Sequence, residues 1–323
     1  MSEHARPNLE VELERKLRCV LEGHYPDWQP RIVGTLGHGM EAVVFLVDTR
    51  HLGRVTIRVP RQRWAAGASW CAMAELIDGR HFLQRDLALS ELLKTEGLPA
   101  TQVHHVHLGE DDFDFTVAEY IANDSHPVDD AELGQIMARI HSLEPPGTYL
   151  DSLIDHACYR EVLFFRMSRR LAGLQQGHDL PGADVEVLRQ VLDRAPEAQS
   201  ILHLDLRRDN ILSRQGAVCA VIDWSSSILG HPALEWARMA EYQRLSYDFT
   251  HGYRWNPVQG IEHEVMLAFR LDAALMLAYL FTGDAYDEDK ADYYLGRVRS
   301  LTHQLQGCTQ RHPRVARAVT VRD

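Results

Sequence analysis

The chain has 323 residues, of which 45% are hydrophobic and 25% are charged, values that fit a globular protein and exclude a largely disordered or fibrous one. Its 34 Lys and Arg against 46 Asp and Glu give a net charge of −12 with histidine neutral, so we expect no nucleic acid partner. The five cysteines include no CxxC pair, which predicts reduced thiols rather than a disulfide framework or a zinc ribbon.

The first part of the chain has the pattern of a small β-rich unit. Apolar residues recur at helical spacing in the opening segment, and a glycine-bearing stretch follows at 34–39. Two strand-like runs separated by a polar turn come next, which indicates an antiparallel hairpin rather than a βαβ unit. In chain order we expect a helix over 8–23, strands over 42–47 and 54–59, a helix over 79–95, and strands over 103–108 and 114–121.

Beyond residue 121 the pattern becomes mainly helical, and one short β-rich island at 201–222 interrupts it. Helices are predicted over 129–143, 155–175, 183–195, 233–245 and 261–281. We therefore predict an α+β protein of two lobes. Residues 1–121 would form a small β-rich N-terminal lobe, and residues 122–323 a larger, mainly helical C-terminal lobe.

The most apolar segment, 267–281, contains Arg270 and Asp272. It therefore predicts a buried helix that is too short to span a bilayer. The N-terminus is charged from its third residue and has no apolar signal core. We expect a cytoplasmic protein with no membrane partner.

The β-rich island carries the polar residues that most strongly indicate chemistry. It contains His203, Asp205 and Asn210 in the order HxDxxxxN, followed by an apolar strand that ends at Asp223. A single Asp after a strand is usually a helix cap or a turn residue. Three such residues around one hairpin are harder to explain in that way, because unpaired carboxylates at the rim of a core cost several kcal/mol.

This order resembles the catalytic loop and the metal-binding Asp of kinases. From the glycine stretch to the last helices, the chain resembles the aminoglycoside phosphotransferase-like superfamily, which includes the choline and aminoglycoside kinases. The resemblance implies a bilobal protein-kinase-like fold. It is carried by residues 37–45, 56–61, 84–89, 117–121, 203–212 and 223–237.

The resemblance implies a nucleotide site, for ATP or GTP, in the N-terminal lobe. Its glycine loop would cover the phosphates with Gly37, His38 and Gly39. Arg58 stands where the family has a lysine, and Asp86 where it has a glutamate. The longer Arg58 and the shorter Asp86 would together span a distance similar to that of the family's lysine–glutamate pair. Arg58 would hold the α- and β-phosphates.

At the hinge, the carbonyl of Glu119 and the N–H of Ile121 would bind the adenine edge, as the resemblance implies. For phosphate transfer it implies that Asp205 orients the acceptor hydroxyl and accepts its proton. Asn210 and Asp223 would bind Mg²⁺, which prefers oxygen ligands. Other positions depart from the family: Leu204 replaces a glycine, and His231 and Glu235 replace aspartates.

The acceptor is expected to be a small hydroxylated molecule, since the short segment between Asp223 and Pro232 leaves no platform for a peptide. Acidic residues outnumber basic ones within 230–295, which would favour a cationic acceptor, although a solvated helical surface explains the excess equally well. The resemblance suggests an antibiotic, whose phosphorylation would give resistance: an aminoglycoside, a macrolide, whose kinases share the Arg-Val-Pro-Arg type of third strand, or another natural product. Four aromatic residues are candidate walls of its site: Trp236, Tyr242, Tyr247 and Trp255.

Two alternatives stay open. The changes at Arg58 and Leu204 are compatible with a catalytically silent nucleotide-binding module of the same fold, and the acceptor could be a metabolite of the choline, homoserine or sugar type. A zinc site at His105 and His107, which alternation places on one face of a strand, is not favoured because two ligands do not complete it. No GxSxG or GxxxxGK[ST] motif occurs, which removes the usual hydrolase and P-loop interpretations.

Overall fold

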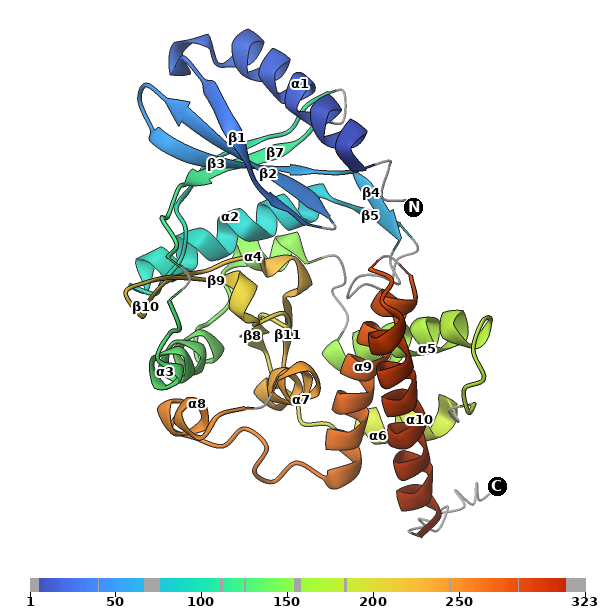
Figure 1. Ribbon diagram of the computed structural model, residues 1–323. Helices are drawn as coiled ribbons and strands as arrows, with labels where there is room; N and C mark the ends of the chain where they lie inside the picture. The colour runs from blue at the N-terminus through green and yellow to red at the C-terminus, as the bar shows by residue number, and fades with distance from the viewer. Residues whose placement is uncertain are drawn as a thin grey trace, which may run out of the picture.

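The computed structural model describes residues 6–39, 41–66, 76–110, 113–124, 126–153, 158–182, 185–243, 245–283 and 285–311. Its N-terminal part is built on a five-stranded antiparallel sheet in the order β1-β2-β3-β7-β6 (Figure 1). The strands are β1 (Arg31–His38), β2 (Ala42–Thr49), β3 (Gly53–Pro60), β6 (Val103–His107) and β7 (Phe115–Glu119). A separate two-stranded ribbon pairs β4 (Trp64–Ala66) with β5 (Leu76–Asp78).

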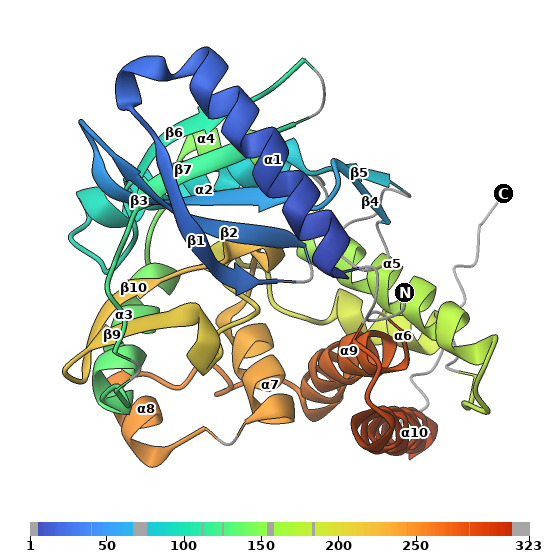
Figure 2. The ribbon, with the colours of Figure 1, turned by 45° about the horizontal axis from the view of Figure 1, so that its top comes forward.

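Successive side chains of a strand point to opposite faces of the sheet, so both faces can pack against other elements. A helix lies on each side of this sheet. Helix α1 (Arg6–His24) crosses the outer face, as Figure 2 shows, and buries Leu13, Leu17 and Leu21 against the strands. Helix α2 (Arg80–Thr95) lies on the side toward the C-terminal lobe. Its Leu89 and Leu93 share a core with residues of that lobe, so α2 connects the two parts of the molecule.

The C-terminal part is mostly helical. Its helices are α3 (Asp130–His141), α4 (Gly147–Ser152), α5 (Tyr159–Gln175), α6 (Val185–Asp193), α7 (Pro232–Tyr242), α8 (Tyr247–Gly252), α9 (His263–Thr282) and α10 (Glu288–Arg311). Helix α9 is long and apolar enough to cross a membrane by composition alone, yet most of it is buried against α5, α7 and α10 (Figure 1). It is a core helix, as the sequence predicts.

Four short strands lie below the sheet and frame the polar island. β8 (Ser200–Leu202) pairs with β11 (Ile228–Gly230), and β9 (Ile211–Arg214) pairs with β10 (Ala217–Val221). Apolar side chains of these strands, with Trp224, join the core that α2 and α3 share. The turns that leave β8 and β10 are thus anchored on packed strands at the junction of the two lobes.

The predicted fold class is confirmed: an antiparallel N-terminal sheet is followed by a mainly helical C-terminal part. Each predicted helix and strand is present with small shifts at its ends. Three helices were not predicted, namely α4, α8 and α10. Cys19, Cys158, Cys219 and Cys308 are free thiols, whereas Cys71 lies outside the described residues.

Candidate active site

The loop of residues 203–210 joins β8 to β9 and carries two of the predicted site residues. The buried Asn210 donates from Nδ2 to Asp205 Oδ2 at 2.7 Å and to the Asp205 carbonyl at 2.8 Å. Arg207 Nε donates to the same carboxylate oxygen at 3.2 Å. Asp205 Oδ1 accepts no hydrogen bond from the described residues, so one oxygen of a fixed carboxylate is left for an incoming hydroxyl group.

A carboxylate from α7 holds the backbone of the 203–210 loop. Glu235 is buried, and its two oxygens accept from the His203 N–H at 2.9 Å and the Leu204 N–H at 2.8 Å. The second bond matters because Leu204 has a φ of 59°, in the left-handed region that is unfavourable for a residue with a Cβ. The loop therefore keeps a glycine-like conformation although Leu204 replaces a glycine.

His141 and Tyr253 extend this network away from the loop. His141 Nε2 bonds to Glu235 Oε2 at 2.9 Å, and its Nδ1 bonds to the Tyr253 hydroxyl. Burial acts to raise the pKa of Glu235, but the hydrogen bond and charge of His141 outweigh it and hold the pKa below its usual value. This link could not be predicted from sequence motifs, because His141 and Tyr253 lie far from the loop along the chain.

Asp223 follows β10 and meets the side chain of Arg58 from β3. Its Oδ1 accepts from Arg58 Nη2 at 2.9 Å and from Ser225 Oγ at 3.0 Å. Burial acts to raise the pKa of Asp223, but the charge of Arg58 prevails and the pKa lies below its usual value. The Ile222 N–H donates to the Asn210 carbonyl at 2.9 Å, so Asn210 and Asp223 lie at neighbouring positions of one hairpin.

Arg58 also reaches α2, where its Nη1 donates to Asp86 Oδ2 at 2.7 Å. The base and acid that the sequence pairs are therefore in contact. Asp86 Oδ1 is buried and has no hydrogen-bond partner among the described residues. A third carboxylate, Glu41, lies 3.8 Å from Arg58 Nη2. Burial and the nearby Asp223 raise the pKa of Glu41 to about 8, against the effect of Arg58; this residue was not predicted as part of the site.

The glycine stretch forms the end of β1 and the turn into β2. The His38 ring turns toward α1, with Nδ1 at 3.3 Å from Glu10 Oε2. The Gly39 carbonyl accepts from Arg61 Nε at 2.9 Å, and a Cβ added at Gly39 would lie 3.2 Å from the Ala42 carbonyl oxygen. A Cβ at Gly37 would meet no atom within 4 Å. The turn is thus tight at Gly39 and open at Gly37; Met40 lies outside the described residues.

The predicted hinge lies at the end of β7. The Glu119 side chain accepts from Lys94 Nζ at 2.6 Å and from the Gln102 N–H at 2.7 Å, and is thereby tied to α2 and the segment before β6. The Ile121 N–H donates to no other residue of the described chain. A main-chain donor is thus left at the position where the sequence predicts an adenine contact.

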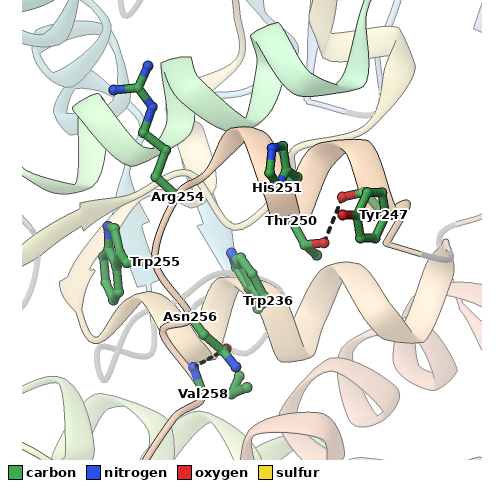
Figure 3. Close-up of a pocket in the computed structure, with 8 residues that line it drawn as sticks. All are labelled: Trp236, Tyr247, Thr250, His251, Arg254, Trp255, Asn256 and Val258. Atoms are coloured by element: carbon green, nitrogen blue, oxygen red, sulfur yellow. Dashed lines mark hydrogen bonds between the residues drawn. The ribbon is translucent and has the colours of Figure 1, made fainter.

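Three of the four predicted aromatic walls line one open groove of about 490 Å³ between α7, α8 and the loop after α8. Figure 3 shows Trp236 in the middle, with Trp255 and Tyr247 toward opposite ends. We call this the aromatic groove. The fourth residue, Tyr242, instead donates its hydroxyl to the Leu206 carbonyl at 3.1 Å, directly after Asp205.

The acidic excess within 230–295 does not form the charged cleft that would attract a cation to this groove. Besides Glu235, two of its carboxylates are buried and neutralised by arginines. Glu241 bonds to Arg270 at 2.5 Å and to Arg297 at 3.0 Å, and Asp272 lies between Arg166 and Arg170. No Asp or Glu lines the aromatic groove as the structure describes it.

His105 and His107 do share one face, as alternation predicts, but they converge on the hydroxyl of Tyr25. The distances are 2.7 Å from His105 Nε2 and 2.8 Å from His107 Nδ1. Among the described residues there is no group of three or more His, Cys, Asp or Glu side chains placed to hold a metal ion. A Mg²⁺ site made of Asn210, Asp223 and phosphate oxygens would contain only one of these four side-chain types, at Asp223. It would therefore not count as a group of this kind.

Comparisons with known proteins identify phosphotransferases, both by sequence profile and by structure. The sequence profile of a phosphotransferase enzyme family matches residues 33–264. No curated protein sequence matches significantly. Among solved structures, a thermostable mutant of aminoglycoside phosphotransferase APH(4)-Ia has a TM-score of 0.59 at 16% identity, covering 84% of this chain and 93% of that one.

Two further solved structures have the same fold at low identity. Aminoglycoside 2'-phosphotransferase-IIIa in its GDP complex has a TM-score of 0.59 at 13% identity, covering 90% of this chain and 98% of that one. Macrolide 2'-phosphotransferase type I has a TM-score of 0.54 at 12% identity, covering 88% and 96%. At such identities these likenesses establish the fold and leave the substrate open.

Proposed function

The chain belongs to the phosphotransferase enzyme family, and we propose that it transfers the γ-phosphate of ATP or GTP to a hydroxyl group of a small molecule. The observation that carries this proposal is the convergence of the Asp205–Asn210 pair, Asp223 and Arg58 where the two lobes meet. In phosphate transfer, positioning and charge neutralisation supply most of the rate, and these side chains are suited to both tasks.

Asp205 is the proposed catalytic carboxylate. Its Oδ2 is held by Asn210 and Arg207, while Oδ1 stays free of described partners. In the proposed step, Oδ1 accepts the proton of the acceptor hydroxyl while the hydroxyl oxygen forms its bond to the γ-phosphorus. The bond from that phosphorus to the β-γ bridging oxygen breaks at the same time, and the nucleoside diphosphate leaves.

Asn210 and Asp223 are the proposed Mg²⁺ ligands, and their chemistry fits the ion. Asn210 uses its Nδ2 toward Asp205, so its oxygen remains available, and the lowered pKa of Asp223 keeps that carboxylate ionised. When bound, the ion would neutralise charge on the nucleotide phosphates.

Arg58, oriented by Asp86, is the proposed phosphate-binding residue, and it also belongs to the catalytic set because it touches the reacting nucleotide. Its 2.7 Å bond to Asp86 supports this role, while its Nη2 would exchange Asp223 for phosphate oxygens. The turn at Gly37, His38 and Gly39 would cover the phosphates. The Glu119 carbonyl and Ile121 N–H would bind the base edge.

The lobes would divide this work, with nucleotide binding in residues 1–121 and catalysis with acceptor binding in residues 122–323. Related structures contain ADP or GDP, and three contain hygromycin B, which supports a nucleotide co-substrate and a small-molecule acceptor. We propose an antibiotic as that acceptor, so that phosphorylation in the cytoplasm would give resistance.

The test is phosphate transfer by the purified protein. Labelled ATP and GTP, each with Mg²⁺, are offered with a panel of hydroxylated antibiotics, amines and sugars, and products are identified by their added phosphate mass. We expect product with at least one acceptor and loss of about a thousandfold in rate for Asp205→Asn. Nucleotide binding without product across the panel, or full turnover by Asp205→Asn, would contradict the proposal.

A further inference from the structure

Arg85 of α2 is a buried cation that binds the backbone of the C-terminal lobe. It is 3% exposed, and its Nη1 donates to the carbonyls of Ser225 at 3.0 Å and Ser227 at 2.8 Å. Its Nη2 donates to the carbonyl of Ser152, the last residue of α4, at 3.3 Å. One guanidinium group thus joins α2 to two segments of that lobe, because its N–H groups point in fixed directions.

The segment that Arg85 binds is the turn that follows Asp223. Asp223 has a φ of 65°, in the left-handed region that is unfavourable for a residue with a Cβ, and the 3₁₀ turn Trp224–Ser226 begins at the next residue. The hydroxyl of Ser225 donates to Asp223 Oδ1 at 3.0 Å, while the carbonyl of Ser225 accepts from Arg85. Ser225 therefore links Arg85 to the carboxylate that is the proposed Mg²⁺ ligand.

Asp86, the next residue of α2, completes a closed ring of contacts. It accepts from Arg58 Nη1 at 2.7 Å, and Arg58 Nη2 donates to Asp223 at 2.9 Å. The peptide bond between Arg85 and Asp86 closes the ring, whose members in order are Arg85, Ser225, Asp223, Arg58 and Asp86. A shift of one member stretches the bonds of its neighbours, so Arg85 limits where Asp223 and Arg58 lie relative to each other.

A second arginine joins the two lobes without being part of this ring. Arg139 of α3 donates from Nη2 to the carbonyl of Glu96, at the C-terminal end of α2, at 2.7 Å. That contact is exposed and includes no member of the ring. The two arginines therefore make the same kind of bond between the lobes, but only Arg85 makes it next to the proposed metal ligand.

We infer that Arg85 is a positioning residue, which sets the place of the metal-binding carboxylate relative to the phosphate-binding Arg58 before the nucleotide binds. This inference rests on the proposed phosphotransferase function and adds a residue to its machinery. With the ring intact, Mg²⁺ and the phosphates meet groups that are already in place, so Mg²⁺ strengthens nucleotide binding. Loosening the ring should weaken this coupling more than it weakens nucleotide binding without the metal.

Calorimetric titration with AMP-PNP and GMP-PNP, with and without Mg²⁺, measures the coupling as the ratio of the two Kd values. Arg85→Lys keeps the charge but loses the fork, so we expect the gain from Mg²⁺ to fall by at least about tenfold. Ser225→Ala, which removes the hydroxyl and keeps the carbonyl, should lower that gain as well. The double variant should lose no more than the larger single loss, because both changes act through Asp223. Arg139→Lys is the matched control and should leave the gain unchanged.

Failure of the ring and failure of the kinase can be told apart. An unchanged gain from Mg²⁺ in either single variant, or losses that add in the double variant, would overturn the inference and leave the phosphotransferase standing. If Arg85→Lys does not fold, Ser225→Ala decides alone by the same criterion. A gain that both variants reduce, without phosphate transfer by the wild type across the acceptor panel, would support the ring and contradict the proposed function. Absence of nucleotide binding by the wild type would contradict both.

Discussion

Two arginine–aspartate clusters in this molecule use the same groups in different surroundings. In the C-terminal core, Arg166 and Arg170 of α5 enclose Asp272 of α9, and Arg166 and Asp272 are both 0% exposed. Between the lobes, Arg58 joins Asp86 to Asp223, and these side chains are 20%, 14% and 33% exposed.

The difference in exposure separates a structural cluster from one able to bind a ligand. Charged side chains that are buried in a core must neutralise one another, because removing one of them leaves the buried charge of its partner uncompensated. Between the lobes, Arg58 and Asp223 remain partly exposed to solvent, and Asp86 Oδ1 is buried without a described partner. Such a cluster can exchange its internal bonds for those of a bound phosphate or metal ion, which an enclosed one cannot do.

The largest effect is expected from Asp223→Asn, which tests the cluster between the lobes directly. Loss of this carboxylate should lower kcat for phosphate transfer by about a thousandfold or more, because charge neutralisation dominates the reaction. Stability should change by no more than about 1 kcal/mol, since solvent reaches the pair. Labelled-phosphate transfer and urea unfolding measure the two quantities.

Asp209→Asn is the control for that prediction, because Asp209 is an 80% exposed acid of the 203–210 loop. It should leave both quantities nearly unchanged. A large loss of stability in Asp223→Asn, with kcat retained, would contradict the prediction. It would mean that the cluster at Asp223 has a structural role, as the buried cluster at Asp272 does.

Asp272→Ala should have the opposite profile. It removes the buried carboxylate that Arg166 and Arg170 share, which should cost about 3–5 kcal/mol of unfolding free energy. The folded fraction should retain wild-type kcat. Glu197→Ala, which breaks a 3.3 Å pair with Arg160 and removes an 89% exposed side chain, is the matched control and should cost less than about 1 kcal/mol. An unchanged urea midpoint for Asp272→Ala would show that the enclosed cluster does not stabilise the fold.

A smaller effect is expected from Arg58→Lys. Lysine loses the fork that bonds Asp86 and Asp223 together, so nucleotide Kd should rise by about tenfold. The double variant Arg58→Lys/Asp86→Glu should recover part of that loss, because the longer acid meets the shorter base. Calorimetric titration with a non-hydrolysable nucleotide measures both. No recovery in the double variant would argue that the two residues do not work as a pair.

The residues of the candidate site that could be predicted from the sequence are those that lie in short motifs. Arg58, Asp86, Asp205, Asn210 and Asp223 stand in motifs with a fixed order, and the structure brings them together as that order suggests. The strands and most helices follow from local periodicity.

Features that depend on packing between distant segments could not be predicted in this way. The bonds from Tyr253 to His141 and from His141 to Glu235 join three separate helical regions, and neither bond has a local sequence signature. The arginine partners of two acids within 230–295 could not be predicted for a similar reason. Glu241 and Asp272 bond to Arg166, Arg170 and Arg297, which come from outside that window.

The smallest expected effect concerns Glu41, an acid beside Arg58 that the motif order did not single out. Burial and Asp223 raise the pKa of Glu41 to about 8. The folded state therefore binds a proton that the unfolded chain releases at lower pH, so this group stabilises the fold at acidic pH. That contribution should fall as pH rises from the ordinary glutamate range toward 8.

Glu41→Gln tests this, because glutamine stays neutral at every pH. Its unfolding free energy relative to wild type should increase between pH 5 and pH 9. The gain should stay within about 1 kcal/mol, because Glu41 is 34% exposed and solvent screens its charge. Urea unfolding at both pH values gives the difference, with Glu12→Gln as the control on an exposed α1 acid that is 51% accessible. A pH-independent difference would mean that Glu41 is already ionised in the folded protein, so that its side chain is less desolvated than its contacts indicate.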